Sequence, residues 1–183
     1  MSEWITYEFQ ILDFIHEHLA CRFLDVVIPI LTSLGNAGIC WFLAAFALIC
    51  TKKYRANGIV MILSILAGAL IGNLTLKPLV ARARPSWICN VPLLIANPTD
   101  YSFPSGHTLS STIGAVCLTC TNRKFAAVAI PFAILMAFTR LYLYVHFPTD
   151  VLAGAALGVV IAFFMQKLVP TFDRLSKGLP QKK

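Results

Sequence analysis

The chain has 183 residues, of which 58% are hydrophobic and 13% are charged, and its mean hydropathy is +0.76. This composition excludes an ordinary soluble domain and is typical of a protein that spans a membrane. We attribute the net charge of +7 to membrane topology and to contact with anionic lipids, and we expect no nucleic-acid partner.

The N-terminal segment, residues 1–27, mixes apolar residues with acids at helical spacing. Trp4, Phe9, Leu12 and Ile15 are among its apolar residues. This pattern predicts an amphipathic helix that lies in the membrane interface, either alone or continuing into a sixth membrane helix.

Apolar runs then follow, each close to the length of about 20 residues that crosses a bilayer as a helix. They cover residues 28–50, 58–76, 105–121, 125–144 and 149–169. The expected fold is therefore all-α, a polytopic bundle of five to six transmembrane helices over residues 28–169. A basic tail, residues 170–183, completes a single domain that extends over residues 1–183.

The basic residues are divided unevenly between the two sides of this bundle. Ten of the fifteen fall on one side: Lys52, Lys53, Arg55, Arg123, Lys124, Lys167, Arg174, Lys177, Lys182 and Lys183. The other side holds Arg22, Lys77, Arg82, Arg84 and Arg140. The positive-inside rule places the ten, with the C-terminus, in the cytoplasm, so the opposite face is directed to the periplasm, the exterior or a lumen.

Cations follow the second span in the stretch 77-KPLVARARP-85. Lys77 and Arg84 stand seven residues apart, about two helical turns, so both can face one ligand if the segment is helical. Arginine offers a planar fork for two phosphate oxygens, and lysine supplies a point charge. Arg82 lies outside this spacing, and we expect it to extend to the membrane surface, as basic residues at helix ends commonly do.

The stretch 101-YSFPSGHTLSS-111 places small and polar residues where the third span begins. A helix N-terminus presents unpaired N–H groups and the positive end of the helix dipole to an anion. Gly106 lets the backbone approach a ligand, Ser105 adds a hydroxyl donor, and His107 can hold or pass a proton near neutral pH. By itself, the stretch fits equally well a capped helix whose histidine faces the interface.

The stretch 139-TRLYLYVHFPTD-150 joins the fourth span to the fifth. Pro148 suits the first turn of a helix, so Asp150 is expected in that turn. A carboxylate there can accept a hydrogen bond from one imidazole nitrogen of His146 and orient the other nitrogen toward a substrate. With Arg140, these residues lie on the same predicted membrane face as the two preceding stretches, which predicts one shared anion site.

These three stretches resemble the signature motifs of the type 2 phosphatidic acid phosphatase superfamily. The motifs are Lys77-x6-Arg84-Pro85, Pro104-Ser105-Gly106-His107 and Arg140-x5-His146-x3-Asp150, in this order over residues 77–150. Thr139 departs from the pattern, since the third motif usually has serine there, but a hydroxyl is kept. The N-terminal third carries no signature of the family.

The resemblance implies a role for each motif residue. His146 attacks phosphorus and forms a phosphohistidine, Asp150 holds its tautomer, and His107 protonates the leaving oxygen and then activates water. The equatorial phosphoryl oxygens are bound by Lys77, Arg84, Arg140, the Ser105 hydroxyl and the Gly106 amide. Phosphoryl transfer requires this kind of positioning and charge stabilisation. Vanadate, which similar haloperoxidases hold in this place, is expected to inhibit as a phosphate mimic.

We expect no metal ion and no other cofactor. The three cations take the part that magnesium plays in kinases, and Asp150 is the only acid expected in the site, so no carboxylate cluster is available for a divalent ion. Cys117 and Cys120 have a metal-like spacing but lie within a predicted span, where helix packing is the expected role.

The expected function is hydrolysis of a membrane lipid phosphate or diphosphate. In a bacterium, conversion of undecaprenyl diphosphate to undecaprenyl phosphate fits a small protein with an outward site; phosphatidylglycerol phosphate and phosphatidic acid are alternatives. The motifs suit a lipid phosphotransferase equally well. A lipid transporter is disfavoured, because transport pathways usually place ionisable groups at mid-membrane depth, and the interiors of the last four spans contain none. The oligomeric state is left open.

Overall fold

The computed structural model describes residues 3–89 and 91–177. The last six residues, with Lys182 and Lys183 of the predicted basic tail, lie outside this part. Helices and their connections make up all of the described residues, with no strand among them, which confirms the all-α expectation.

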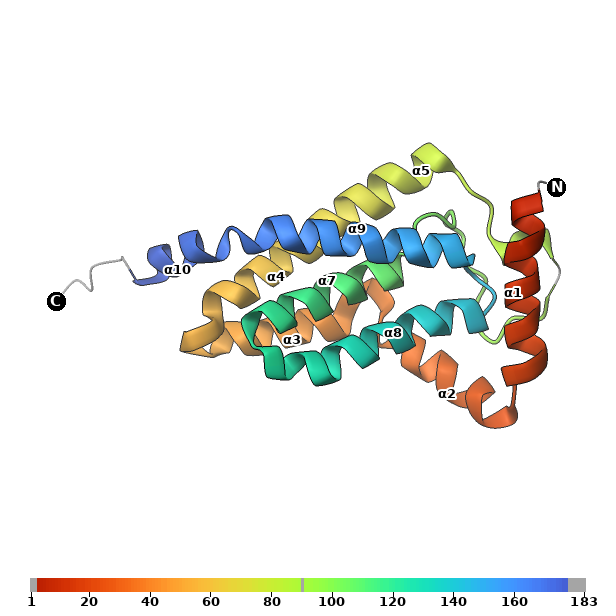
Figure 1. Cartoon of the computed structure of the whole chain (residues 1–183), viewed down its shortest axis with the longest axis horizontal. Helices are drawn as coiled ribbons and strands as arrows, with labels where there is room; N and C mark the ends of the chain where they lie inside the picture. Colours follow the sequence, from red (N-terminus) through yellow and green to blue (C-terminus); the bar gives the residue numbers. More distant parts are fainter. Residues whose placement is uncertain (1–2, 90, 178–183) are drawn as a thin grey trace.

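Figure 1 shows an elongated bundle with one helix across its end. The bundle consists of α2 (Arg22–Ser33), α3 (Ile39–Cys50), α4 (Arg55–Gly68), α7 (Gly106–Thr121), α8 (Ala126–Tyr142) and α9 (Pro148–Gln166), and α10 (Val169–Lys177) extends α9. A π-helical segment, η3 (Ala69–Leu76), continues α4 into α5 (Lys77–Val80), and α6 (Pro85–Ile88) follows. Short 3-10 turns, η1 (Asn36–Gly38), η2 (Lys52–Tyr54) and η4 (Arg123–Phe125), begin α3, α4 and α8.

By length and composition, three helical stretches of the described chain can cross a membrane: Lys52–Ile88, Arg123–Tyr142 and Pro148–Leu175. The pair Arg22–Ser33 and Asn36–Cys50, bent by 47°, adds a fourth if it forms one broken span. The predicted third span, α7, has 16 residues, fewer than the roughly 20 of a full crossing. The count of five to six spans therefore stays a prediction.

Helix α1 (Glu3–Leu19) lies across the end of the bundle, next to the start of α9 (Figure 1). Its inner face buries Phe9 and Leu12 against Tyr144 and Phe147. Its outer face exposes four large apolar side chains, those of Trp4, Tyr7, Ile11 and Phe14. This orientation suits a helix in the plane of a membrane surface, although that location stays a prediction.

Glycines allow α9 to pack closely against α7. A Cβ atom at Gly154 would lie 2.7 Å from the carbonyl oxygen of Ser105, and one at Gly158 would lie 3.0 Å from that of Leu109. Small residues at such positions let helix backbones approach each other. The close contact brings the first turn of α9 beside the first turn of α7, where Ser105 N–H donates to the Asp150 carbonyl oxygen at 3.0 Å.

Candidate active site

The three motifs meet at the end of the bundle that α1 covers. Lys77 begins α5, Arg84 precedes α6, and His107 is in the first turn of α7. Arg140 is in the last turn of α8, and His146 lies in the connection to α9. These five side chains line one cavity of about 780 Å³. Helix ends that the sequence assigned to one face thus contribute to one site.

His146 is held between Arg84 and Asp150. The Nη1 atom of Arg84 lies 3.2 Å from His146 Nε2, and His146 Nδ1 lies 3.5 Å from Asp150 Oδ2. Because a guanidinium can only donate, Nε2 must accept, so the ring proton belongs on Nδ1 and points to Asp150. The lone pair on Nε2 is therefore directed to the side of the ring where Arg84 and the cavity lie.

Burial keeps the ring of His146 neutral. Only 1% of its surface is exposed. This burial, together with the positive charges of Arg84 and Arg140, lowers the pKa of His146 to about 3, against the opposing effect of Asp150. A neutral imidazole with a defined tautomer is the form that acts as a nucleophile.

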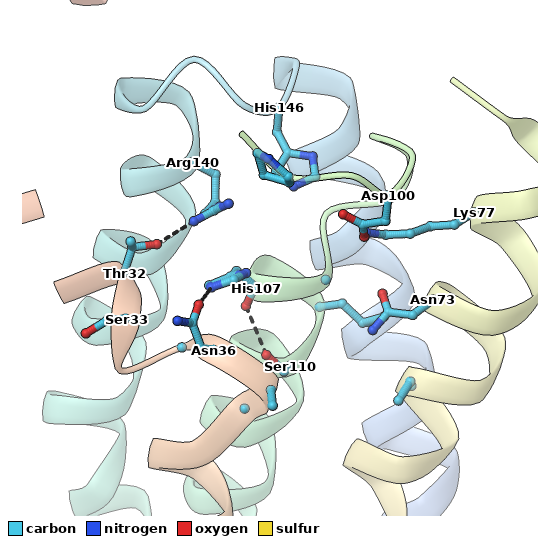
Figure 2. A pocket seen from close by; sticks show the side chains of 18 of the residues that line it. Thr32, Ser33, Asn36, Asn73, Lys77, Asp100, His107, Ser110, Arg140 and His146 are labelled. Atoms are coloured by element: carbon cyan, nitrogen blue, oxygen red, sulfur yellow. Dashed lines mark hydrogen bonds and ion pairs between the residues drawn. The ribbon is translucent and has the colours of Figure 1, made fainter. Parts of the chain in front are cut away.

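Asp100 corrects the expectation that Asp150 is the only acid in the site. Its carboxylate contacts Lys77 Nζ through Oδ2 and accepts from Arg84 Nη2 through Oδ1 at 2.8 Å, while its carbonyl oxygen accepts from Arg84 Nε at 2.7 Å. Burial acts to raise the pKa of Asp100, but Lys77 and Arg84 outweigh it and lower the pKa to about 2. An ionised carboxylate thus pairs with two of the three cations that are expected to bind phosphate, Lys77 and Arg84. Figure 2 shows Asp100 beside Lys77.

The partners of Arg140 and His107 lie in the last turn of α2 and at the start of η1. Arg140 Nη1 donates to Thr32 Oγ1 at 2.5 Å, and His107 Nε2 lies 3.1 Å from Asn36 Oδ1 (Figure 2). Arg140 is 4% exposed, and its Nε atom is one of two buried side-chain nitrogens in the described chain without a hydrogen-bond partner, the other being in Gln166. An unpaired donor of a buried cation is suited to an incoming anion.

Gly106 lies on the cavity wall and Ser105 lies behind it. Gly106 lines the cavity, and a Cβ atom there would be 2.8 Å from Asn73 Oδ1. Ser105 is fully buried, and its hydroxyl accepts from Thr108 Oγ1 at 3.0 Å. This bond uses the Ser105 oxygen as an acceptor, and phosphate binding by the hydroxyl of Ser105 stays a prediction. Asp150 is also fully buried behind His146.

Arg82 does not extend to the membrane surface as expected, because two acids draw its guanidinium inward. Nη1 donates to Asp150 Oδ1 and to Thr149 Oγ1, both at 2.6 Å, and Nη2 contacts the carboxylate of Glu8. The guanidinium carbon also lies 4.2 Å from the centre of the Phe147 ring. The side chain is 22% exposed.

Sequence reasoning missed the residues that hold the motif side chains in place: Glu8, Thr32, Asn36, Asp100 and Ser102. Ser102, which is fully buried, donates its hydroxyl to Asp150. Asp100 and Ser102 stand directly before the motif around His107, so polar type and proximity were the available signals for these two. Thr32 and Asn36 are polar residues within the apolar run 28–50, which was the available signal for them, whereas Glu8 is one of several acids in its segment.

The described residues contain no group of three or more His, Cys, Asp or Glu side chains placed to hold a metal ion. Cys117 is buried in the core of the bundle, where its thiol lies 3.9 Å from Ser64 Oγ, and Cys120 is exposed. Metal independence itself stays a prediction.

The family model described as the PAP2 superfamily matches residues 57–174, well over half of the chain. The chain belongs to this superfamily. The resemblance drawn from the motifs is thereby confirmed. All motif residues lie within the matched range, whereas α1, α2 and α3 precede it.

Among PAP2 relatives, an undecaprenyl-diphosphatase of Sulfolobus acidocaldarius is 35% identical over 72% of this chain and 64% of its own length. Phosphatidylglycerophosphatase B of Bacillus subtilis is 33% identical over 69% of this chain and 63% of its own. The chain thus spans somewhat less than two thirds of the length of these two relatives.

Solved PAP2 structures share the fold. Aquifex aeolicus LpxE superimposes with a TM-score of 0.76 at 26% identity, over 87% of this chain and 94% of its own. The PAP2 type phosphatidylglycerolphosphate phosphatase of Bacillus subtilis superimposes with a TM-score of 0.74 at 23% identity, over 100% of this chain and 90% of its own. The helical membrane fold of the family is therefore shown for this chain.

Proposed function

We propose that this PAP2 protein hydrolyses the phosphate or diphosphate of a membrane lipid through a phosphohistidine intermediate. One observation carries the proposal: His146, neutral and fixed by Asp150, stands with Lys77, Arg84 and Arg140 on the wall of one cavity. A nucleophile held among three cations is suited to a phosphoryl group.

The chemistry proceeds in two steps. In the first, the Nε2 lone pair of His146 attacks phosphorus, the bond to the leaving oxygen breaks, and His107 gives that oxygen a proton. Asp150 stabilises the positive charge that the imidazole acquires. In the second step, water gives a proton to His107 as its oxygen attacks phosphorus, and the N–P bond breaks. Lys77, Arg84 and Arg140 hold the phosphoryl oxygens throughout.

The shape of the cavity supports a lipid substrate. From the cations, its wall continues to apolar side chains of the membrane region, among them Phe42, Ile65, Leu66 and Ile113. Leu66 is 52% exposed, so this part of the wall opens toward the lipid side of α4. A phosphate at one end and an apolar chain at the other match a lipid headgroup with its tail.

Undecaprenyl diphosphate is the substrate that we put first, because the 35% identical relative is an undecaprenyl-diphosphatase. Phosphatidylglycerol phosphate remains the main alternative, since another relative is a phosphatidylglycerophosphatase. Phosphatidic acid is a further alternative substrate, and transfer of the phosphoryl group to a second lipid is an alternative to hydrolysis. The cations and histidines on the cavity wall serve all four reactions.

A phosphate-release assay in detergent tests the proposal with undecaprenyl diphosphate, phosphatidylglycerol phosphate and phosphatidic acid. We expect release from all three to depend on His146, and the highest kcat/KM for undecaprenyl diphosphate. A higher value for another lipid reassigns the substrate. Labelled phosphate that appears in a second lipid, with none released as inorganic phosphate, identifies a transferase. Absence of both products in the wild-type protein overturns the function.

The site is proposed to open outside the cytoplasm. The turns that carry Lys52, Lys53, Arg55, Arg123 and Lys124 lie at the end of the bundle remote from α1 and the site (Figure 1). Basic turns are retained in the cytoplasm. Single cysteines placed in the 51–57 and 86–100 loops of a chain without native cysteines can be labelled in intact cells with an impermeant thiol reagent. The second loop should react and the first should not; the reverse pattern places the site inside.

A further inference from the structure

Glu8, in the middle of α1, is a buried acid on a helix that precedes the range matched by the family model. Its side chain is 8% exposed. One oxygen, Oε1, accepts from Thr149 N–H at 3.1 Å and from Thr149 Oγ1 at 2.5 Å, and the other contacts Arg82 Nη2. Burying an ionised carboxylate is costly unless it is paired and hydrogen-bonded, so these contacts hold it in one orientation.

Arg82 links this carboxylate to the one behind His146. Its two terminal nitrogens divide between the two acids: Nη2 contacts Glu8, and Nη1 donates to Asp150 Oδ1 at 2.6 Å. The planar guanidinium fixes the angle between the two bonds, and the Phe147 ring lies against its face at 4.2 Å. Because Glu8 fixes the position of Nη2, and the guanidinium is planar, Glu8 also restricts the position of Nη1 next to Asp150.

The two carboxylate oxygens of Asp150 contact different groups. Oδ2 accepts from the Ser102 hydroxyl and from Phe147 N–H at 2.8 Å, and it faces Nδ1 of His146 at 3.5 Å. Oδ1 is occupied by Arg82. A partial rotation of the carboxylate, by about a quarter turn, would move both oxygens out of line with the ring of His146. The contact of Arg82 with Oδ1 opposes this rotation and so keeps Oδ2 facing Nδ1.

We propose that Glu8 is a positioning residue for His146, acting through Arg82 and Thr149 on the carboxylate of Asp150. The inference rests on the proposed function, because it assigns α1 a part in orienting the nucleophile. Glu8 is absent from the residues that line the cavity, so its loss should slow the attack on phosphorus and leave binding of the phosphoryl group intact.

The test compares Glu8→Gln with Glu17→Gln, an exposed acid on the same helix. Both full-length proteins are assayed with dioctanoyl phosphatidic acid and undecaprenyl diphosphate. A misplacement of about 1 Å can cost about a hundredfold in rate, so Glu8→Gln should lower kcat at least about tenfold, with KM within about twofold. Glu17→Gln should match the wild type. Arg82→Lys, which keeps the charge but not the fork, should also lower kcat and spare KM.

Two further measurements separate positioning from folding. The Glu8→Gln variant should bind inorganic vanadate as the wild type does, and the rate of phosphohistidine formation in a single turnover should fall with kcat. A variant with lower thermal stability but wild-type kcat per folded molecule overturns the proposal, as does a rise in KM alone. An inactive wild-type protein contradicts the proposed function instead, whereas an active wild type with an equally active Glu8→Gln contradicts only the part assigned to Glu8.

Discussion

Residues 77–150 and the N-terminal third supply different kinds of group to the same site. The first region provides the cations and histidines on the cavity wall. The second provides further partners: Thr32 for Arg140, Asn36 for His107, and Glu8 for Arg82, which is not among the cavity-lining residues. A side chain that meets phosphate must be of one type at one position, whereas a partner needs only an oxygen within reach. This is why the first region carries readable motifs and the second does not.

The largest effect should come from the histidines of the motif region. His146→Ala removes the nucleophile, and we expect a loss of at least about a thousandfold in phosphate release. His107→Ala should be severely impaired as well, but it should accumulate phosphorylated enzyme from a substrate with a good leaving group, because the attack itself remains. Acid-labile phosphate on the protein measures this. Near-normal release by His146→Ala would reject the assignment of the nucleophile.

A smaller loss should follow when an N-terminal partner is removed. Asn36→Ala takes away the acceptor at 3.1 Å from His107 Nε2, so the ring loses its orientation but keeps its chemistry. We expect kcat to fall about tenfold, the size of one lost hydrogen bond of about 1.4 kcal/mol, and less than the loss of a general acid. Asn57→Ala, on α4 and away from the cavity, is the matched control. Equal activity of the two variants would show that the N-terminal third only supports the fold.

Replacement of Asp100 should strengthen binding of a phosphate mimic, whereas the replacements above should weaken activity. Its carboxylate contacts Lys77 and Arg84, the cations expected to hold phosphate. Asp100→Asn removes a competing negative charge, so vanadate should inhibit the variant about fivefold more tightly, as a partly exposed ion pair contributes up to about 1 kcal/mol. Inhibition constants of variant and wild type give the answer. Weaker inhibition would mean that Asp100 orients the two cations for the ligand.

The last prediction concerns the pH dependence of stability and not activity. The pKa of His146 is lowered from 6.5 to about 3 in the folded protein, so between these values the unfolded chain binds a proton that the folded protein does not. Stability should fall as pH falls from 6.5 toward 3, by up to about 1.4 kcal/mol per pH unit from this group. Above pH 6.5 its contribution is fully present and constant.

Unfolding of His146→Ala in detergent at several pH values checks this prediction. The variant should show a shallower fall below pH 6.5 than the wild type does. His18→Ala, on the exposed side of α1, is the control and should follow the wild type. Parallel curves for His146→Ala and wild type would mean that His146 is not held neutral by burial.

The sequence alone determined the fold class, the motif residues and their common face. Apolar runs long enough to cross a bilayer and fixed spacings such as that of His146 and Asp150 are local properties, and they survive in any packing of the helices. The unequal division of basic turns is equally local. These features therefore led to the cations and the two histidines without reference to the three-dimensional structure.

The tertiary structure alone decided which groups meet across the chain. Arg82 and Glu8 are 74 residues apart, Arg140 and Thr32 are 108 apart, and His107 and Asn36 are 71 apart. Arg82 lies within the motif region and by spacing was expected at the membrane surface, yet α1 and α9 present two carboxylates that draw it inward. Asp100 was likewise placed on Lys77 and Arg84 by the path of its loop. Such pairs depend on how helices cross and where loops return, and no periodicity in the sequence encodes that.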